Sequence, residues 1–155
     1  MASPAEVIRA LMIRDGLVMY PIGRATRQNE LPQCFVGMMP NEIDVAVLLA
    51  DTTPRMFGRA MVGTTWKHYG IKLNLRHLAS NGQAGYDVIK SISDWIDYLE
   101  VPTQVNSRGK TCHVCSLYKD ADVKDIGEER GTNRRLWSMD LLLAMRTVEQ
   151  TPIEE

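Results

Sequence analysis

The sequence predicts a single α+β domain, in which two helices pack on one face of a single mixed or antiparallel β-sheet. Three observations predict this class. Two segments carry apolar residues at helical spacing, several others alternate apolar and polar residues as strands do, and 155 residues suit one core better than two. Hydrophobic residues make up 45% and charged residues 24% of the chain, which is typical of globular proteins and argues against disorder.

The first element is a helix predicted over Pro4–Arg14. Ser3 and Glu6 form a capping box, in which the Ser3 hydroxyl accepts from the Glu6 amide and the Glu6 carboxylate reaches back to Ser3. Pro4 stands at the first helical position, where its missing N–H costs nothing. Apolar residues then recur at helical spacing until Gly16, which ends the helix.

The next segments predict strands joined by irregular connections. Proline and glycine punctuate residues 17–32, where we expect only a short strand near Val18–Tyr20. Three strands follow, over Cys34–Met39, Glu42–Ala50 and Ile71–Leu78. The last two alternate between apolar and more polar positions. Such alternation is typical of a sheet with one face on a core and the other face wetter or covered by a partner.

A second helix is predicted from Gly82 to about Tyr98. Its apolar stripe comprises Tyr86, Ile89, Ile92, Trp95, Ile96 and Leu99. A polar turn, a strand, a charged loop and a long final strand follow, over Thr103–Gly109, Lys110–Tyr118, Asp120–Gly131 and Arg134–Val148. Residues 1–155 therefore form one predicted domain, with an acidic, frayed tail over 149–155.

The connection over Asp51–Gly70 is long for a link between two strands. It contains two arginines and several large apolar residues, and the candidate contact residues in it are Arg55, Met56, Phe57, Arg59, Met61 and Trp66. Long loops with large side chains are usually functional or bound to a partner. The alternative is that the loop folds back and Trp66 caps the core.

Charge is balanced overall but divided locally. Lys and Arg number 18 against 19 Asp and Glu, so the chain has no global basic field that would hold a nucleic acid. One acidic block is followed directly by a basic one; together they comprise Asp120, Asp122, Asp125, Glu128, Glu129, Arg130, Arg134 and Arg135. These blocks can form a self-complementary contact, acidic on one subunit and basic on the next, repeated around a ring. The alternative is a solvated loop with local ion pairs.

Cys112-His113-Val114-Cys115 is the stretch that comes nearest to a metal or redox motif. Residues three apart on a strand point to opposite faces, so the two cysteines cannot share an ion without a tight knuckle. Buried or edge cysteines are the favoured interpretation, with metal and redox roles as alternatives. Asp94 and Asp97 fit a solvated helix face, and His77 fits a core or rim histidine.

No motif typical of an enzyme occurs in the sequence: a nucleophile elbow, a phosphate-binding loop and a zinc-protease motif are all missing. We therefore expect no catalytic residues, no cofactor and no metal. No apolar stretch approaches the roughly 20 residues that span a bilayer, and the N-terminus lacks the pattern of a signal peptide. Three cysteines, an odd number, favour reduced thiols in a cytoplasm.

The chain resembles the small tail-terminator, or tail-completion, proteins of long-tailed bacteriophages. Besides the two helices, the matching segments are Asn41–Val47, Asp51–Pro54, Phe57–Met61, Ile71–Arg76, Val114–Tyr118, Asp125–Gly127 and Arg135–Leu143. Glu128 stands where the family has an aspartate after the glycine. The resemblance covers most of the chain, and it is one of architecture and loosely similar sequence segments, not of invariant motifs.

This resemblance implies a structural virion protein. Such proteins form a hexameric ring that stops polymerisation of the tail tube, receives the head–neck complex and surrounds the channel through which DNA passes. The six residues of the long connection would then face the tube protein or the neck protein, and the charged blocks would form the subunit contact. Another neck protein, or a small metal- or ligand-binding α+β module near Cys112, remains an alternative.

Overall fold

The computed structural model of the protein describes residues 3–27, 30–52, 55–56, 67–129 and 131–148. Its helices are α1 (Pro4–Arg14) and α2 (Gly82–Tyr98), with a short 3-10 turn over Ala79–Asn81. Its strands are β1 (Gln33–Val36), β2 (Ala46–Asp51), β3 (Arg55–Met56), β4 (Lys67–Leu78), β5 (Thr103–Ser107), β6 (Lys110–Glu129) and β7 (Arg134–Val148). All seven strands belong to one sheet.

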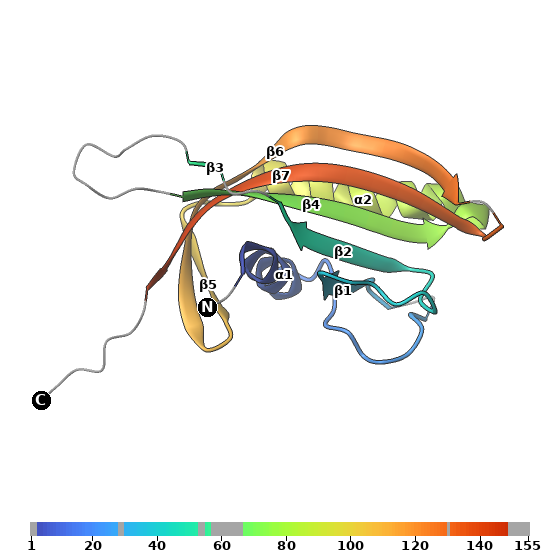
Figure 1. Ribbon diagram of the computed structural model, residues 1–155, viewed down its shortest axis with the longest axis horizontal. Coiled ribbons are helices and arrows are strands. Elements are labelled where there is room, and N and C mark those ends of the chain that lie inside the picture. Colours follow the sequence, from blue (N-terminus) through green and yellow to red (C-terminus); the bar gives the residue numbers. More distant parts are fainter. Residues whose placement is uncertain (1–2, 28–29, 53–54, 57–66, 130, 149–155) are drawn as a thin grey trace, which may run out of the picture.

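The sheet is mixed, in the order β1-β2-β4-β7-β6-β5, and β3 pairs with β4 outside this path. β1 and β2 run parallel, whereas every other neighbouring pair is antiparallel. Figure 1 shows β4, β7 and β6 as three long, curved strands side by side. β6 shifts register against β7 at four places, and such irregularities bend a strand and increase its twist. The predicted α+β class with a single sheet is confirmed.

One core lies between the sheet and both helices. Ile71, Leu73 and Leu75 of β4 stand opposite Leu141, Met139 and Trp137 of β7, and all six side chains are buried. The buried residues of the helices belong to the same cluster; they are Ala5, Val7, Ile8, Leu11 and Met12 of α1, and Ile89, Ile92 and Ile96 of α2. Both helices therefore pack on one face, as the alternation of the strands predicts.

Helix α1 has the predicted bounds, and its first turn is capped from two sides. Ser3 Oγ accepts from the Glu6 amide at 3.2 Å, and Asp51 Oδ1 accepts from the Ala5 amide at 2.9 Å. The second half of the predicted capping box is wrong. The Glu6 carboxylate forms an ion pair with Arg108 instead, with 2.7 Å between Oε2 and Nε, because the β5–β6 hairpin brings a guanidinium within reach.

In the first half of the sheet, the strands differ from the prediction mainly at their ends. The segment near Val18–Tyr20 contributes a single bridge from Met19 to Gln33, and β1 ends at Val36. β2 begins at Ala46. In the loop before it, the carbonyls of Pro40 and Ile43 accept from Arg76 Nη1 at 2.9 and 3.1 Å, which holds this loop against the sheet.

Two predictions for the second half of the chain are wrong. The predicted polar turn over Thr103–Gly109 contains β5, and only its end makes a turn, where Arg108 and Gly109 have φ of 52° and 73°. Two successive positive φ values are typical of tight hairpins. The predicted charged loop over Asp120–Gly131 is mostly strand, since β6 continues to Glu129 along β7. Among the described helices, none is long and apolar enough to cross a membrane.

Candidate functional site

The residues predicted to face a tube or neck protein lie only partly within the described chain. Arg55 and Met56 form β3, whose backbone stands opposite His68 and Lys67 of β4. Because β4 begins at Lys67, the long connection is shorter than predicted. The other candidates, Phe57, Arg59, Met61 and Trp66, lie outside the described residues. Their role as a contact surface stays a prediction.

The acidic block of the predicted subunit contact lies on β6, at the margin of the sheet. Asp120, Asp122, Asp125, Glu128 and Glu129 all belong to this strand. β5 covers its outer edge only as far as Val114, and beyond that point β6 is the outermost strand of the sheet in the described part of the chain. Charged side chains and irregular register are the usual protection of an edge strand against unspecific pairing.

The basic block is engaged within the same chain. The Arg135 guanidinium binds the Asp125 carboxylate through two contacts, and Arg134 Nε lies 2.8 Å from Asp44 Oδ1. Arg134 also donates to the carbonyl of Asn41. Arg135 therefore forms a local ion pair, as the alternative interpretation expects, whereas Arg134 pairs with a residue ninety positions away. Arg130 lies outside the described residues.

The ion pair with Arg135 lowers the pKa of the Asp125 carboxyl group. Hydrogen bonds from Arg135 hold the pKa of Asp125 below its ordinary value, and the Gly127 amide, which also donates to this carboxylate, acts in the same direction. Asp125 is therefore ionised at neutral pH. The acidic character of β6 persists beside the arginines because only one of its five acidic groups is bound by them in this way.

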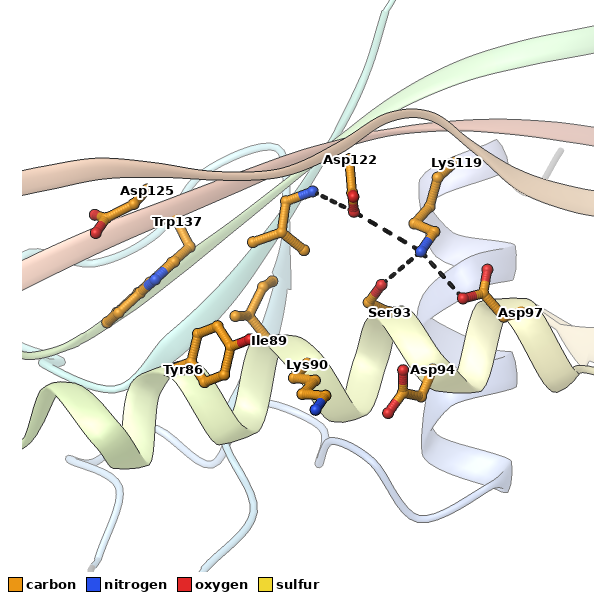
Figure 2. A pocket seen from close by; sticks show the side chains of 11 residues that line it. Tyr86, Ile89, Lys90, Ser93, Asp94, Asp97, Lys119, Asp122, Asp125 and Trp137 are labelled. Carbon is orange, nitrogen blue, oxygen red and sulfur yellow. Dashed lines mark hydrogen bonds and ion pairs between the residues drawn. The ribbon is translucent and has the colours of Figure 1, made fainter.

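A groove runs between α2 and β6, and we call it the α2–β6 groove. It has a volume of 430 Å³ and is lined by Tyr86, Ile89, Lys90, Ser93, Asp94, Asp97, Lys119, Asp122, Val123, Asp125 and Trp137. Figure 2 shows Lys119 reaching from the strand toward the helix. Its Nζ lies 2.7 Å from Ser93 Oγ, 3.1 Å from Asp97 Oδ2 and 3.8 Å from Asp122 Oδ1.

The groove depends on a close approach of α2 to the sheet. A Cβ atom at Gly85 would lie 2.5 Å from Trp137 Cη2, so only glycine lets the helix pack on this ring. Tyr86, predicted to lie in the apolar stripe, is 48% exposed and stands at the groove wall. The groove thus joins an apolar floor, including Ile89 and Val123, to a rim of carboxylates. This combination suits a cationic group carried on an apolar stem.

Sequence reasoning found part of this groove and missed its centre. Asp94 and Asp97 are exposed, as expected for a polar helix face, but the sequence does not indicate that they border a groove. Lys119 was not singled out, because its partners Ser93 and Asp97 lie more than twenty positions away in the chain. The usable signal was Lys119 itself. It is a cation on the side of β6 that faces α2, and it stands opposite buried Leu141 of β7.

The three cysteines do not lie together as one cluster. Cys112 is buried and Cys115 is exposed, as the geometry of a strand predicts, and Cys34 is buried elsewhere in the core. Burial raises the pKa of the Cys34 thiol to about 12. Within the described ranges, no group of three or more His, Cys, Asp or Glu is arranged to hold a metal ion.

His77 is a rim histidine, as predicted. It is 9% exposed, and its Nδ1 accepts from the Leu78 amide at 2.9 Å. Burial lowers its pKa, so the ring is neutral at physiological pH. The histidine therefore helps to complete the packing beneath α2, where its Cβ lies 3.1 Å from the position that a Cβ of residue 85 would take.

Comparisons with known proteins add little to this description. No family model and no curated protein matches the sequence. Among solved structures, one protein whose name states no function aligns with 97% of this chain and 100% of its own, at a TM-score of 0.48 and 12% sequence identity. A likeness of this size carries no argument about fold or function. Any function must therefore be argued from the surfaces described above.

Proposed function

We propose that this protein is a structural component of phage particles, which forms a hexameric ring at the head-proximal end of the tail tube. The ring stops polymerisation of the tube and provides the surface to which the head–neck complex attaches. The proposal starts from the resemblance of the element order and sequence segments to tail-terminator proteins. It requires surfaces that hold other proteins, and the strongest support comes from the outer edge of β6.

The second half of β6, Ser116–Glu129, is a long edge with dense charge. In the described part of the chain, no strand lies beyond it, and β5 ends its pairing at Val114. A bare sheet edge invites unspecific association, whereas charges and bulges restrict it to partners that match them. A charged edge beside a groove is therefore suited to a defined protein contact. This is what a ring subunit needs.

The proposed partners are further copies of the chain, the tail tube protein and a head-completion or neck protein. The long connection, with Arg55 and Phe57, is the proposed surface toward the tube or the neck. DNA would pass through the ring without sequence-specific binding, since a net charge of -1 provides no strong hold on phosphates. The protein would act in the virion after assembly in the host cytoplasm, with no catalytic step and no cofactor.

Electron micrographs of particles assembled without this protein test the proposal. The gene is deleted from a phage that encodes it, and the intact gene is supplied from a plasmid as the control. We expect abnormally long, headless tails without the protein and normal particles with the plasmid. Headless tails of normal length would point to another neck component instead. Normal particles in its absence would contradict the proposal.

A further inference from the structure

The tip of the β5–β6 hairpin, Ser107–Lys110, carries a basic residue in an uncommon conformation. Arg108 has φ of 52°, a left-handed value that costs a non-glycine residue conformational energy. Its side chain is 68% exposed. Gly109 and Lys110 follow it, and Lys110 adds a second cation at the tip. The hairpin therefore presents positive charge at its end.

Arg108 is anchored on one side only. Its Nε lies 2.7 Å from Glu6 Oε2, and the Glu6 side chain is only 12% exposed. A guanidinium has five N–H donors arranged in a planar fork, so this single ion pair through Nε leaves the two Nη groups for another acceptor. Two thirds of the side chain is exposed, which gives a further carboxylate access to it. The tip is a preformed cationic protrusion.

The α2–β6 groove carries an acidic group that can receive it. Four aspartates and two lysines line the groove; Lys119 pairs with Asp97 and Asp122, and Arg135 holds Asp125, whereas Asp94 has no ion pair among the described contacts. Asp94 and Asp122 stand on opposite walls, on α2 and β6, and both are exposed. Between these walls, half-buried Val123 offers apolar surface for the stem of an arginine, while the Asp94 carboxylate meets its head.

The two features cannot meet within one chain. Lys110 at the tip and Asp122 in the groove lie on the same strand, 12 residues apart. At about 3.3 Å per residue the strand separates them by up to roughly 40 Å, less what its register shifts against β7 take up. A contact between them must therefore join two copies, head to tail. Contacts of this kind close into a ring when the rotation between copies permits, and otherwise extend as a filament.

We propose that the hairpin tip of one copy inserts Arg108 into the α2–β6 groove of the next copy. Each copy offers one tip and one groove, so the same contact repeats around the assembly. That this contact closes the ring rests on the proposed function, but the contact itself can be tested with the isolated chain. The hairpin of one copy then lies against the groove side of α2 and β6 in the next copy, while Arg135 stays bound to Asp125 of its own chain.

Disulfide trapping tests the contact, in a Cys115→Ser background that removes the exposed native thiol. Arg108→Cys and Asp122→Cys are combined in one chain, and the full-length protein is oxidised mildly at roughly 1 mM, where even a millimolar Kd gives a populated contact. We expect the double-cysteine chain to give a ladder of cross-linked oligomers. A mixture of the Arg108→Cys and Asp122→Cys single variants should give dimers that contain one copy of each. The matched control combines Arg108→Cys with Lys72→Cys in place of Asp122→Cys. Lys72 is exposed on β4 and stands opposite Asp140 of β7.

A charge exchange separates the contact from damage to the fold. Arg108→Glu and Asp94→Lys should each lower self-association at least tenfold, as measured by sedimentation. The double variant should regain most of it, because its acidic tip again meets a basic site. Misfolding cannot produce such a recovery. A double variant weaker than either single one, or a ladder no stronger than the Lys72→Cys control, would overturn the proposal.

The outcomes also distinguish this inference from the function on which it rests. Overlong tails in the deleted phage, with no trapping between tip and groove, would overturn the contact and leave the terminator role standing. Trapping and charge exchange as expected, with normal tails in the deleted phage, would support the contact and contradict the terminator role. Occupation of the groove by a basic segment of the tube protein, with no effect of Arg108→Glu on ring formation, would also overturn the contact.

Discussion

The two halves of β6 differ in what surrounds them, although they belong to one strand. In the first half, Cys112 and Val114 are fully buried, and β5 covers the outer edge. In the second half, most side chains are exposed or half-buried, the register against β7 shifts repeatedly, and the outer edge has no strand beyond it among the described residues. The first half is part of the core, and the second half, apart from Leu117, is mostly surface.

This difference shows how one strand serves two purposes. Backbone pairing with β7 runs along both halves, so the second half keeps its strand geometry without a large apolar contribution. Its side chains are then available for the groove and the charged edge. Folding stability is therefore expected to depend on the first half, and association with other copies on the second. The predictions below test this division, beginning with the largest effect.

The two cysteines of β6 should differ most. Cys115 is exposed, whereas Cys112 is fully buried three residues earlier. We expect Cys112 to react with a thiol reagent at least about 100-fold more slowly, because its reaction awaits an opening of the fold that costs several kcal/mol. Mass spectrometry of the labelled peptides measures both rates. Cys115→Ser should abolish the fast phase, and equal rates for the two thiols would contradict the burial of Cys112 in the first half.

Two valines allow a matched comparison of stability. Val114 is fully buried in the first half, and Val123 is half-buried in the second. Val114→Ala should lower the free energy of unfolding by about 2 kcal/mol, through lost burial and a cavity, and Val123→Ala by about 1 kcal/mol or less. Urea unfolding measures both, and the loss of β-propensity is common to the two variants. A larger effect at Val123 would show that the second half carries the core.

The smallest effect concerns pH. Hydrogen bonds from Arg135 lower the pKa of Asp125 below 3.8, so this carboxylate stabilises the folded state above that pH and ceases to do so as the pH falls below it. The second half of β6 should lose protection against hydrogen exchange before the first half as the pH decreases through this range. Asp125→Asn should remove that dependence. An unchanged pH profile in the variant would show that the pair does not hold this half to β7.

The elements predicted correctly from the sequence are those whose signals are local. Ser3, Pro4 and Glu6 mark the start of α1 within four residues, and the alternation over Arg134–Val148 marks the whole of β7. The second half of β6 carries no such signal, because charged residues occupy both of its faces and its strand geometry comes from pairing with β7. β5, with the polar sequence Thr-Gln-Val-Asn-Ser, depends in the same way on β6.

The residues of the candidate site, too, could be predicted from the sequence only where their signal is local. The exposed aspartates of α2 could be predicted from helical spacing, since they lie away from the apolar stripe. Their neighbour Lys119 could not, because it comes from a strand whose distance from α2 is set by the packing of Gly85 on Trp137. The partner of Arg134 was missed for this reason too, since the structure brings Asp44 to it from ninety positions away.

We propose that the chain works as a ring at one end of a phage tail. The most direct measurement is the number and position of its copies in purified particles, by quantitative mass spectrometry and by antibody labelling in electron micrographs. We expect six copies per tail, with the label confined to the end that meets the head. Absence of the protein from finished particles, or a label along the tube or at its distal tip, would contradict it.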